Sequence, residues 1–155
     1  MHKKAELVQN TLRELGADVT VREFPAGTHS SADAAEAVGA SVAQIAKSVV
    51  FSGTDGHVLV IASGANRVDP VKVEKHLGES IQSVDAKTVK LLTGFSVGGV
   101  PPVAHTNPPK VLLDADLLAH EIVWAAAGTP NAVFPIAPAD LARVAGAEVV
   151  DIRLD

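Results

Sequence analysis

The chain has 155 residues and contains no cysteine. This absence excludes disulfide bonds, thiolate metal sites and a cysteine nucleophile together. A chain without cysteine suits a reducing compartment, and we expect a cytoplasmic location. Any hydrolytic activity would have to rely on other chemical groups.

Aromatic residues are also scarce, since the sequence has no tyrosine and aromatics make up 3% of it. The core should therefore be built largely from Ala and Val, with few flat rings on which bases could stack. The net charge of −5 is unlike that of a broad nucleic-acid surface, which is usually basic. We expect no DNA partner, although a small basic patch that grips one RNA end is compatible with this charge.

Long apolar runs are missing as well. None approaches the ~20 residues that a transmembrane helix needs. The first six residues, MHKKAE, are charged and lead into an amphipathic pattern instead of the apolar core of a signal segment. We expect no membrane partner.

The familiar catalytic motifs are absent too. The six histidines show no His-x-x-x-His spacing, so we expect no metal site. No Gly-x-Ser-x-Gly elbow exists, and the pair Gly98 and Gly99 does not match a phosphate or dinucleotide loop, so we expect no cofactor. A hydrolase with this sequence would have to use water, backbone groups and charge.

The patterns that are present predict helices and strands in irregular order, and hence one α/β (α+β) domain with a mixed sheet over residues 1–155. Helical periodicity, capping residues and glycine stops predict helices. They lie at residues 7–15, 30–39, 41–47, 70–77, 85–93 and 138–144. Runs rich in β-branched residues predict strands. They lie at residues 19–24, 48–52, 57–62, 111–113, 121–126, 132–136 and 148–152.

Lys47 is a charged residue among apolar neighbours, at a predicted helix-to-strand junction. It could complement the end of the helix while its stem covers apolar surface, and spacing alone favours this structural role. It could instead be a cation at a cleft that grips a phosphate or a developing oxyanion.

The segment 94–102, GFSVGGVPP, is a second candidate. Its glycines permit unusual backbone shapes and its two prolines stiffen the exit, so it could aim bare N–H and C=O groups at a ligand. Composition alone favours a plain turn. Asp114 could likewise cap residues 115–118 or face a pocket, and capping is favoured. Residues 128–131 are predicted to form a turn.

Five segments, in order, resemble the YbaK/ProX family of aminoacyl-tRNA editing domains. Residues 44–51, QIAKSVVF, resemble the lysine motif of that family, and residues 98–102, GGVPP, resemble its Gly-x-x-x-Pro loop. Residues 28–39, 111–114 and 126–131 resemble its opening segment, a following strand and a late glycine-rich turn. The resemblance implies a mixed, barrel-like sheet flanked by helices.

The resemblance also implies an enzyme similar to the insertion domain of bacterial prolyl-tRNA synthetases. Such a deacylase would hydrolyse mischarged aminoacyl-tRNA, most often tRNA(Pro) carrying alanine or cysteine, and could associate with a prolyl-tRNA synthetase. Lys47 would hold the phosphate of the terminal adenosine. The backbone of the loop would position water or the 2′-hydroxyl; its matching residues are Gly98, Gly99 and Pro102.

The remaining positions would line the amino-acid pocket by the same resemblance: Thr28, Ser30, Ser48, Val100, Asp114 and Gly128. His29 stands where relatives often carry arginine. His105, just past the loop, could border the pocket or be exposed, and exposure is favoured. A non-catalytic module that binds tRNA or a synthetase is the alternative function, and a protein that binds a free amino acid is a third.

Overall fold

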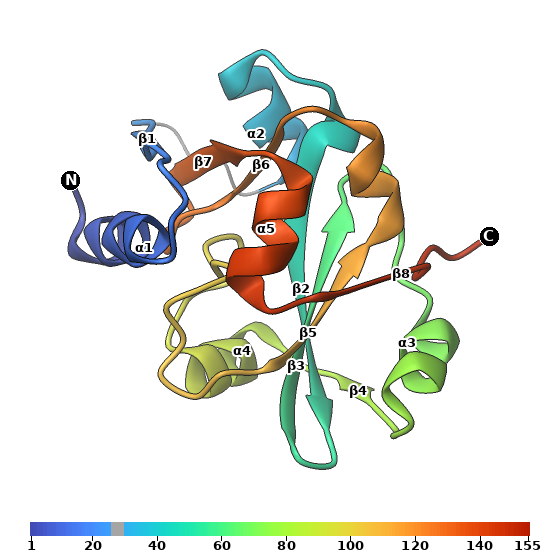
Figure 1. Cartoon of the computed structure of the whole chain (residues 1–155). Coiled ribbons are helices and arrows are strands. Elements are labelled where there is room, and N and C mark those ends of the chain that lie inside the picture. The colour runs from blue at the N-terminus through green and yellow to red at the C-terminus, as the bar shows by residue number, and fades with distance from the viewer. Residues whose placement is uncertain (26–29) are drawn as a thin grey trace.

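A long antiparallel hairpin is the centre of the sheet in the computed structural model, which describes residues 1–25 and 30–155. Strand β2 (Ile45–Gly53) pairs with β3 (Gly56–Ser63) over their whole length. The glycine-rich turn that the sequence predicts between them is confirmed. Figure 1 shows this hairpin extending beyond the rest of the sheet.

Mixed pairing extends the sheet on both sides of the hairpin (Figure 1). Beyond β3 lie two strands, each parallel to its inner neighbour: β5 (Lys110–Asp114) and β8 (Glu148–Val150). Beyond β2 lies β6 (Val123–Ala126), which is parallel to β2. Next come β7 (Ala132–Ile136), antiparallel to β6, and β1 (Arg22–Glu23), antiparallel to β7. The short β4 (Gln82–Ser83) pairs with the far end of β2. The expected mixed sheet flanked by helices is confirmed.

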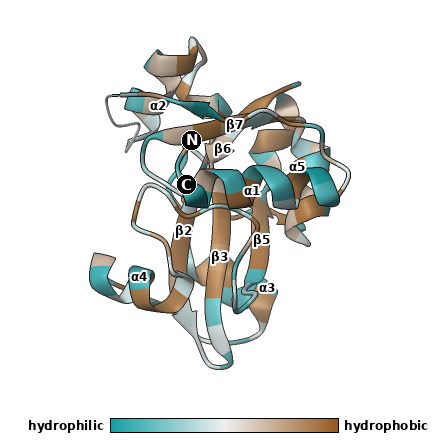
Figure 2. Ribbon diagram, turned by 90° about the vertical axis from the view of Figure 1, so that its left-hand side faces the viewer, coloured by the Kyte–Doolittle hydropathy of each residue, from teal (hydrophilic) through white to brown (hydrophobic). Residues whose placement is uncertain are grey.

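Strand β3 separates two apolar layers because its side chains alternate between the faces of the sheet. Leu59 and Ile61 join the main core, whereas Val58, Val60 and Ala62 join a second cluster on the other face. Figure 2 shows the resulting hydrophobic colouring of the central strands. Three helices contribute to the main core: α1 (Lys3–Glu14), α4 (Ala86–Thr93) and α5 (Pro138–Ala145). Helix α3 (Pro70–Leu77) packs on the second cluster.

Local capping chemistry accounts for the helix boundaries. The side chains of Ser30, Asp69 and Asp85 accept hydrogen bonds from the first turns of α2 (Ser31–Val38), α3 and α4. Each of these helices ends at a glycine in the left-handed conformation, which glycine adopts without steric cost. These predicted boundaries are confirmed.

The predicted helix over residues 41–47 is wrong in its second half. The capping box at Ser41 and Gln44 does form, but it encloses only a 3-10 turn, η1 (Val42–Gln44). Residues 45–47 belong to β2 instead. Ile45 and Ala46 pair with β6, and Ala46 and Lys47 pair with β3. Pairing across the sheet thus overrides the local helix signal. The predicted first strand shortens to β1, and β4 was not predicted.

No helix among the described residues is long and apolar enough to cross a membrane.

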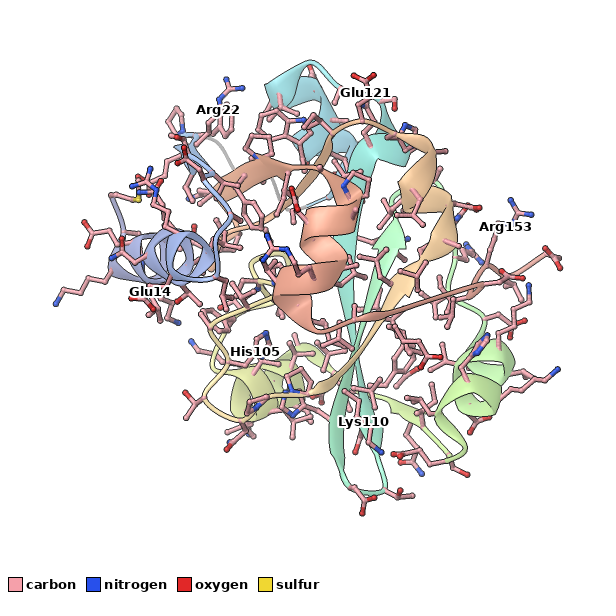
Figure 3. All side chains as sticks on the ribbon, viewed as in Figure 1. Glu14, Arg22, His105, Lys110, Glu121 and Arg153 are labelled. Carbon is pink, nitrogen blue, oxygen red and sulfur yellow. The ribbon has the colours of Figure 1, made fainter. Side chains whose placement is uncertain are left out.

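The buried imidazole of His57, a residue of β3, lies against the imidazole of His105. The rings of His57 and His105 stack with centroids 6.0 Å apart, and Phe95 packs against His105. His105 is labelled in Figure 3 and is partly buried, so the expectation of an exposed side chain is wrong. Its Nε2 donates to the carbonyl of Pro101 at 2.7 Å. Within the described part of the chain, His57 Nε2 and His105 Nδ1 have no hydrogen-bond partner.

This histidine pair should make the protein less stable in mild acid. Burial lowers the pKa of both imidazoles, and the pKa of His57 is lowered further by His105. Below about pH 6.5 the unfolded chain therefore binds protons that the folded chain resists, and the free energy of unfolding falls. Urea unfolding at pH 7.5 and 5.5 should show this loss, and His57→Gln should reduce it. The exposed His76→Gln variant is the control, and a pH dependence equal in all three proteins would contradict the prediction.

Candidate functional site

Strand β2 has an open edge between two short pairings. Its start pairs with β6 at Ile45 and Ala46, and its end pairs with β4 at Phe51 and Ser52. Along the intervening residues 47–50, no strand of the described chain pairs on that side. The N–H of Gly64 donates to the carbonyl of Ile45, so the backbone groups of Ile45 face β3. Because alternate residues turn these groups to opposite sides of a strand, Ser48 turns its N–H and C=O toward the open edge. The site is therefore a gap in the sheet with bare backbone groups.

A cavity of about 270 Å³ lies beside this gap. Its walls come from α2, β2, the segment after α4, and the strands β6 and β7. Small and apolar side chains predominate, and Lys47 is the one cation among the described residues that line it. The lining includes Ser30, Lys47, Ser48, Gly98, Val100 and Trp124. The structure thus brings together five of the residues singled out in the sequence, from segments far apart in the chain.

Lys47 is partly buried, and its ammonium group is held in place by the loop that follows β3. Its Nζ donates to the carbonyl of Asn66 at 2.6 Å. Burial lowers the pKa of Lys47, the charge of nearby Arg67 lowers it further, and the Asp114 carboxylate partly opposes both effects. An ammonium has three donors, so two remain for an anion in the cavity. An anion there would offset the cost of burying the positive charge.

Asp114 fixes the position of Asn66, the residue that binds the Lys47 ammonium group. Its carboxylate, only 1% exposed, accepts hydrogen bonds from the backbone N–H of Ser63, the side-chain amide of Asn66 and the backbone N–H of Asp116. It also caps the 3-10 helix η2 (Ala115–Ala119), as predicted. Asp114 is not among the described residues that line the cavity, where the resemblance had placed it. It holds Asn66, whose carbonyl holds Lys47.

The segment 94–102 is a fixed loop anchored at both ends in the main core. Phe95, Val100 and Val103 are buried there, and the N–H of Gly99 donates to the carbonyl of Ser96. Gly98 has a φ of +87°, which a side chain would strain, and it lines the cavity. A Cβ on Gly99 would lie 2.7 Å from the backbone of Thr129, so a side chain there would separate the loop from the 128–131 turn.

Two other predicted site residues, Pro102 and Gly128, are not among the lining residues of the cavity. Pro102 borders a separate small cavity with His105, on the side of α5. Gly128 packs its backbone against Lys4, where a Cβ would come within 2.9 Å of a carbonyl oxygen, so it does not line the cavity. Thr28 and His29 fall outside the described residues.

Sequence reasoning missed several residues of the site. Trp124 and Val133 line the cavity from β6 and β7, and Asn66 positions Lys47 through its carbonyl. The apolar runs at residues 121–126 and 132–136 predicted these strands but gave no sign that they share a cavity with α2. Among the described residues, no group of three or more His, Asp or Glu side chains could hold a metal ion.

Removing the Asp114 charge should destabilise the fold. In Asp114→Asn the amide can no longer accept all three buried hydrogen bonds, so at least one donor loses its partner. We expect the free energy of unfolding to fall by ~3 kcal/mol. Asp116→Asn changes a neighbouring carboxylate that is exposed, and it should cost less than about 1 kcal/mol. Chemical denaturation of the two variants checks this, and equal losses would contradict a special role for Asp114.

Comparison with known proteins gives a consistent result. A solved structure described as that of a candidate trans-editing enzyme for prolyl-tRNA synthetase is 42% identical and superposes with a TM-score of 0.94, covering 100% of this chain and 99% of that one. The structure of hypothetical protein APE2540 is 28% identical with a TM-score of 0.88, over 96% and 99% of the two chains. The uncharacterized protein YwhH of Bacillus subtilis (strain 168) is 31% identical over 87% of each chain.

The model of the aminoacyl-tRNA editing domain matches residues 25–144. That range contains the lysine strand, the 94–102 loop and the strands that enclose the cavity. The chain therefore belongs to the aminoacyl-tRNA editing domain family.

Proposed function

We propose that this protein is a deacylase that hydrolyses the ester of mischarged tRNA, with tRNA(Pro) carrying a small wrong amino acid such as alanine or cysteine as its substrate. The observation that carries the proposal is the position of Lys47. Lys47 lines a small cavity together with Gly98, and its ammonium group donates to the carbonyl of Asn66. The membership of the editing family and the description of the 42% identical neighbour support the same substrate class.

In the proposed reaction, a lysine charge binds the substrate and backbone groups orient it. Lys47 would bind the phosphate of the terminal adenosine or the ester oxygen with the donors that Asn66 leaves free. The backbone of Gly98 and the open edge at Ser48 would orient the aminoacyl group and the attacking water. Water adds to the ester carbonyl carbon, the bond to the ribose oxygen breaks, and that oxygen takes up a proton. The products are a free amino acid and uncharged tRNA.

The cavity supports a small amino acid as the group removed. Its volume of about 270 Å³ lies below the ~300–1,000 Å³ of sites that take drug-sized ligands. Ala34, Ala46, Ala125 and Ala126 form much of its wall, so no lining side chain reaches far into it from these positions. An aminoacyl ester is already activated, and its hydrolysis needs placement more than a strong base.

Deacylation of a panel of mischarged tRNAs tests this function. Wild type should release alanine or cysteine from tRNA(Pro) faster than buffer does. Lys47→Ala should lower kcat by a factor on the order of 10²–10³, the effect of removing one charge-stabilising donor. Lys75→Ala removes an exposed lysine of α3 and should leave the rate unchanged.

The alternative is a module that binds tRNA or a synthetase without catalysis. If wild type deacylates no member of the panel faster than buffer, the deacylase proposal fails. Binding of tRNA or of prolyl-tRNA synthetase in that case would favour the module.

A further inference from the structure

The exposed side of α4 carries an apolar groove next to the candidate site. The groove has a volume of about 640 Å³ and lies between α4 and the start of the 94–102 loop. Leu91 is 77% exposed and Val97 is 53% exposed, although both are large apolar residues. Figure 2 shows α4 at the outside of the molecule, beside β2. Such exposed apolar side chains on one face are typical of a binding surface.

Lysines surround this groove. Lys87 and Lys90, three residues apart on α4, line it on the same face of the helix. Lys4 lies at its edge, with Nζ donating to the carbonyl of Gly94 at 3.0 Å. The nearby acidic group is Asp85, whose carboxylate caps α4 by accepting from Thr88. A chain with a net charge of −5 therefore places a local cluster of positive charge here.

Other lysines of the chain are already neutralised by carboxylates. Lys72 pairs with Asp151 and Asp155, and Lys110, labelled in Figure 3, pairs with Glu79. Among the described residues, neither Lys87 nor Lys90 has an ion pair with a carboxylate. Their charges are available to a ligand with phosphates.

The groove adjoins the candidate site at one residue. Val97 lines both the groove and the cavity that contains Lys47. A polymer whose end lies in the cavity can therefore leave it over Val97 and along α4. This geometry requires an occupant with apolar faces and regularly spaced negative charges, which describes single-stranded RNA.

Building on the proposed function, we propose that α4 docks the single-stranded 3′ end of tRNA. The aminoacyl group of the terminal adenosine occupies the cavity. The preceding nucleotides lie in the groove, with bases or riboses on Leu91 and Val97 and phosphates at Lys87 and Lys90. Duplex RNA has no unstacked bases to offer these apolar side chains, so the surface selects a frayed or single-stranded end.

Binding of a fluorescent RNA hairpin tests this docking without any need for catalysis. The hairpin ends in an unpaired 3′ tail of four nucleotides, and a blunt hairpin is the matched RNA. Wild type should bind the tailed RNA at least tenfold more tightly than the blunt one. Lys87→Ala/Lys90→Ala should weaken tailed-RNA binding about tenfold. It should also reduce the slope of log affinity against log salt by about 0.7 for each lysine.

Matched variants separate charge at α4 from charge in general. Lys3→Ala/Lys75→Ala removes two exposed lysines from α1 and α3 and should bind like wild type. Lys87→Arg/Lys90→Arg keeps both charges and should also retain affinity. Thermal unfolding of all variants checks that they are folded, since these side chains are exposed.

Two results would overturn the docking proposal. One is equal tailed-RNA affinity for the α4 double variant and the Lys3 and Lys75 control. The other is retained RNA affinity with loss of binding to prolyl-tRNA synthetase, which would make α4 a protein interface. The deacylase proposal has its own readout, hydrolysis of aminoacyl-adenosine, which lacks the preceding nucleotides. RNA docking can thus fail while hydrolysis of this ester persists, and the reverse.

Discussion

The buried carboxylate of Asp114 is the interaction on which the site depends. Burying a charge without partners costs several kcal/mol, so its oxygens must be fully engaged. They are engaged by Ser63 at the end of β3, by Asn66 in the next loop and by Asp116 in η2. One carboxylate therefore fixes the ends of two adjacent strands and the loop between the sheet and α3. The Lys47 ammonium is placed by that loop through a single carbonyl. Its position is a consequence of the buried charge behind it.

The open edge of β2 is the second constraint. A strand edge with unpaired N–H and C=O groups is a liability that proteins usually cover or shorten. Here the unpaired stretch spans only residues 47–50, and side chains of the 94–102 loop lie beside it. Backbone groups in such a gap are fixed by the ladder with β3 on their other side. They can therefore meet a ligand without a loss of conformational freedom, which favours tight placement of a small group.

Much of the fold could be predicted from the sequence because its signals are local. Caps at Ser30, Asp69 and Asp85 and the glycines that follow each helix depend on neighbours within one turn. The failure at residues 45–47 has a different cause. A capping box at Ser41 and Gln44 satisfies the local rule, yet pairing of Ile45 and Ala46 with β6 requires contacts almost 80 residues away in the chain. A pattern of neighbouring residues carries no information about such partners.

The same limit applies to the site. Lys47 and Gly98 could be singled out by resemblance. For Asp114 the local sequence favoured the cap that forms, whereas the resemblance implied the pocket; its bond to Asn66 depends on tertiary contacts that neither could show. Among the lysines, sequence could not separate Lys72 and Lys110 from Lys87 and Lys90. Only folding brings Asp151 and Glu79 to the first pair and leaves the second pair without a carboxylate.

An acidic protein that handles a polyanion must solve a problem of selectivity. Uniform positive charge would bind any RNA strongly, since phosphate contacts carry no information about sequence or end. Here the cations lie in two different settings. Lys47 is partly buried and lines the cavity, whereas Lys87 and Lys90 are exposed beside apolar side chains. An RNA can contact both the cavity lysine and the α4 lysines only if it has a free end and unstacked bases. The net negative charge of the protein disfavours the binding of RNA that lacks such an end. Sparse positive charge at these positions thus favours recognition of an end over general affinity for RNA.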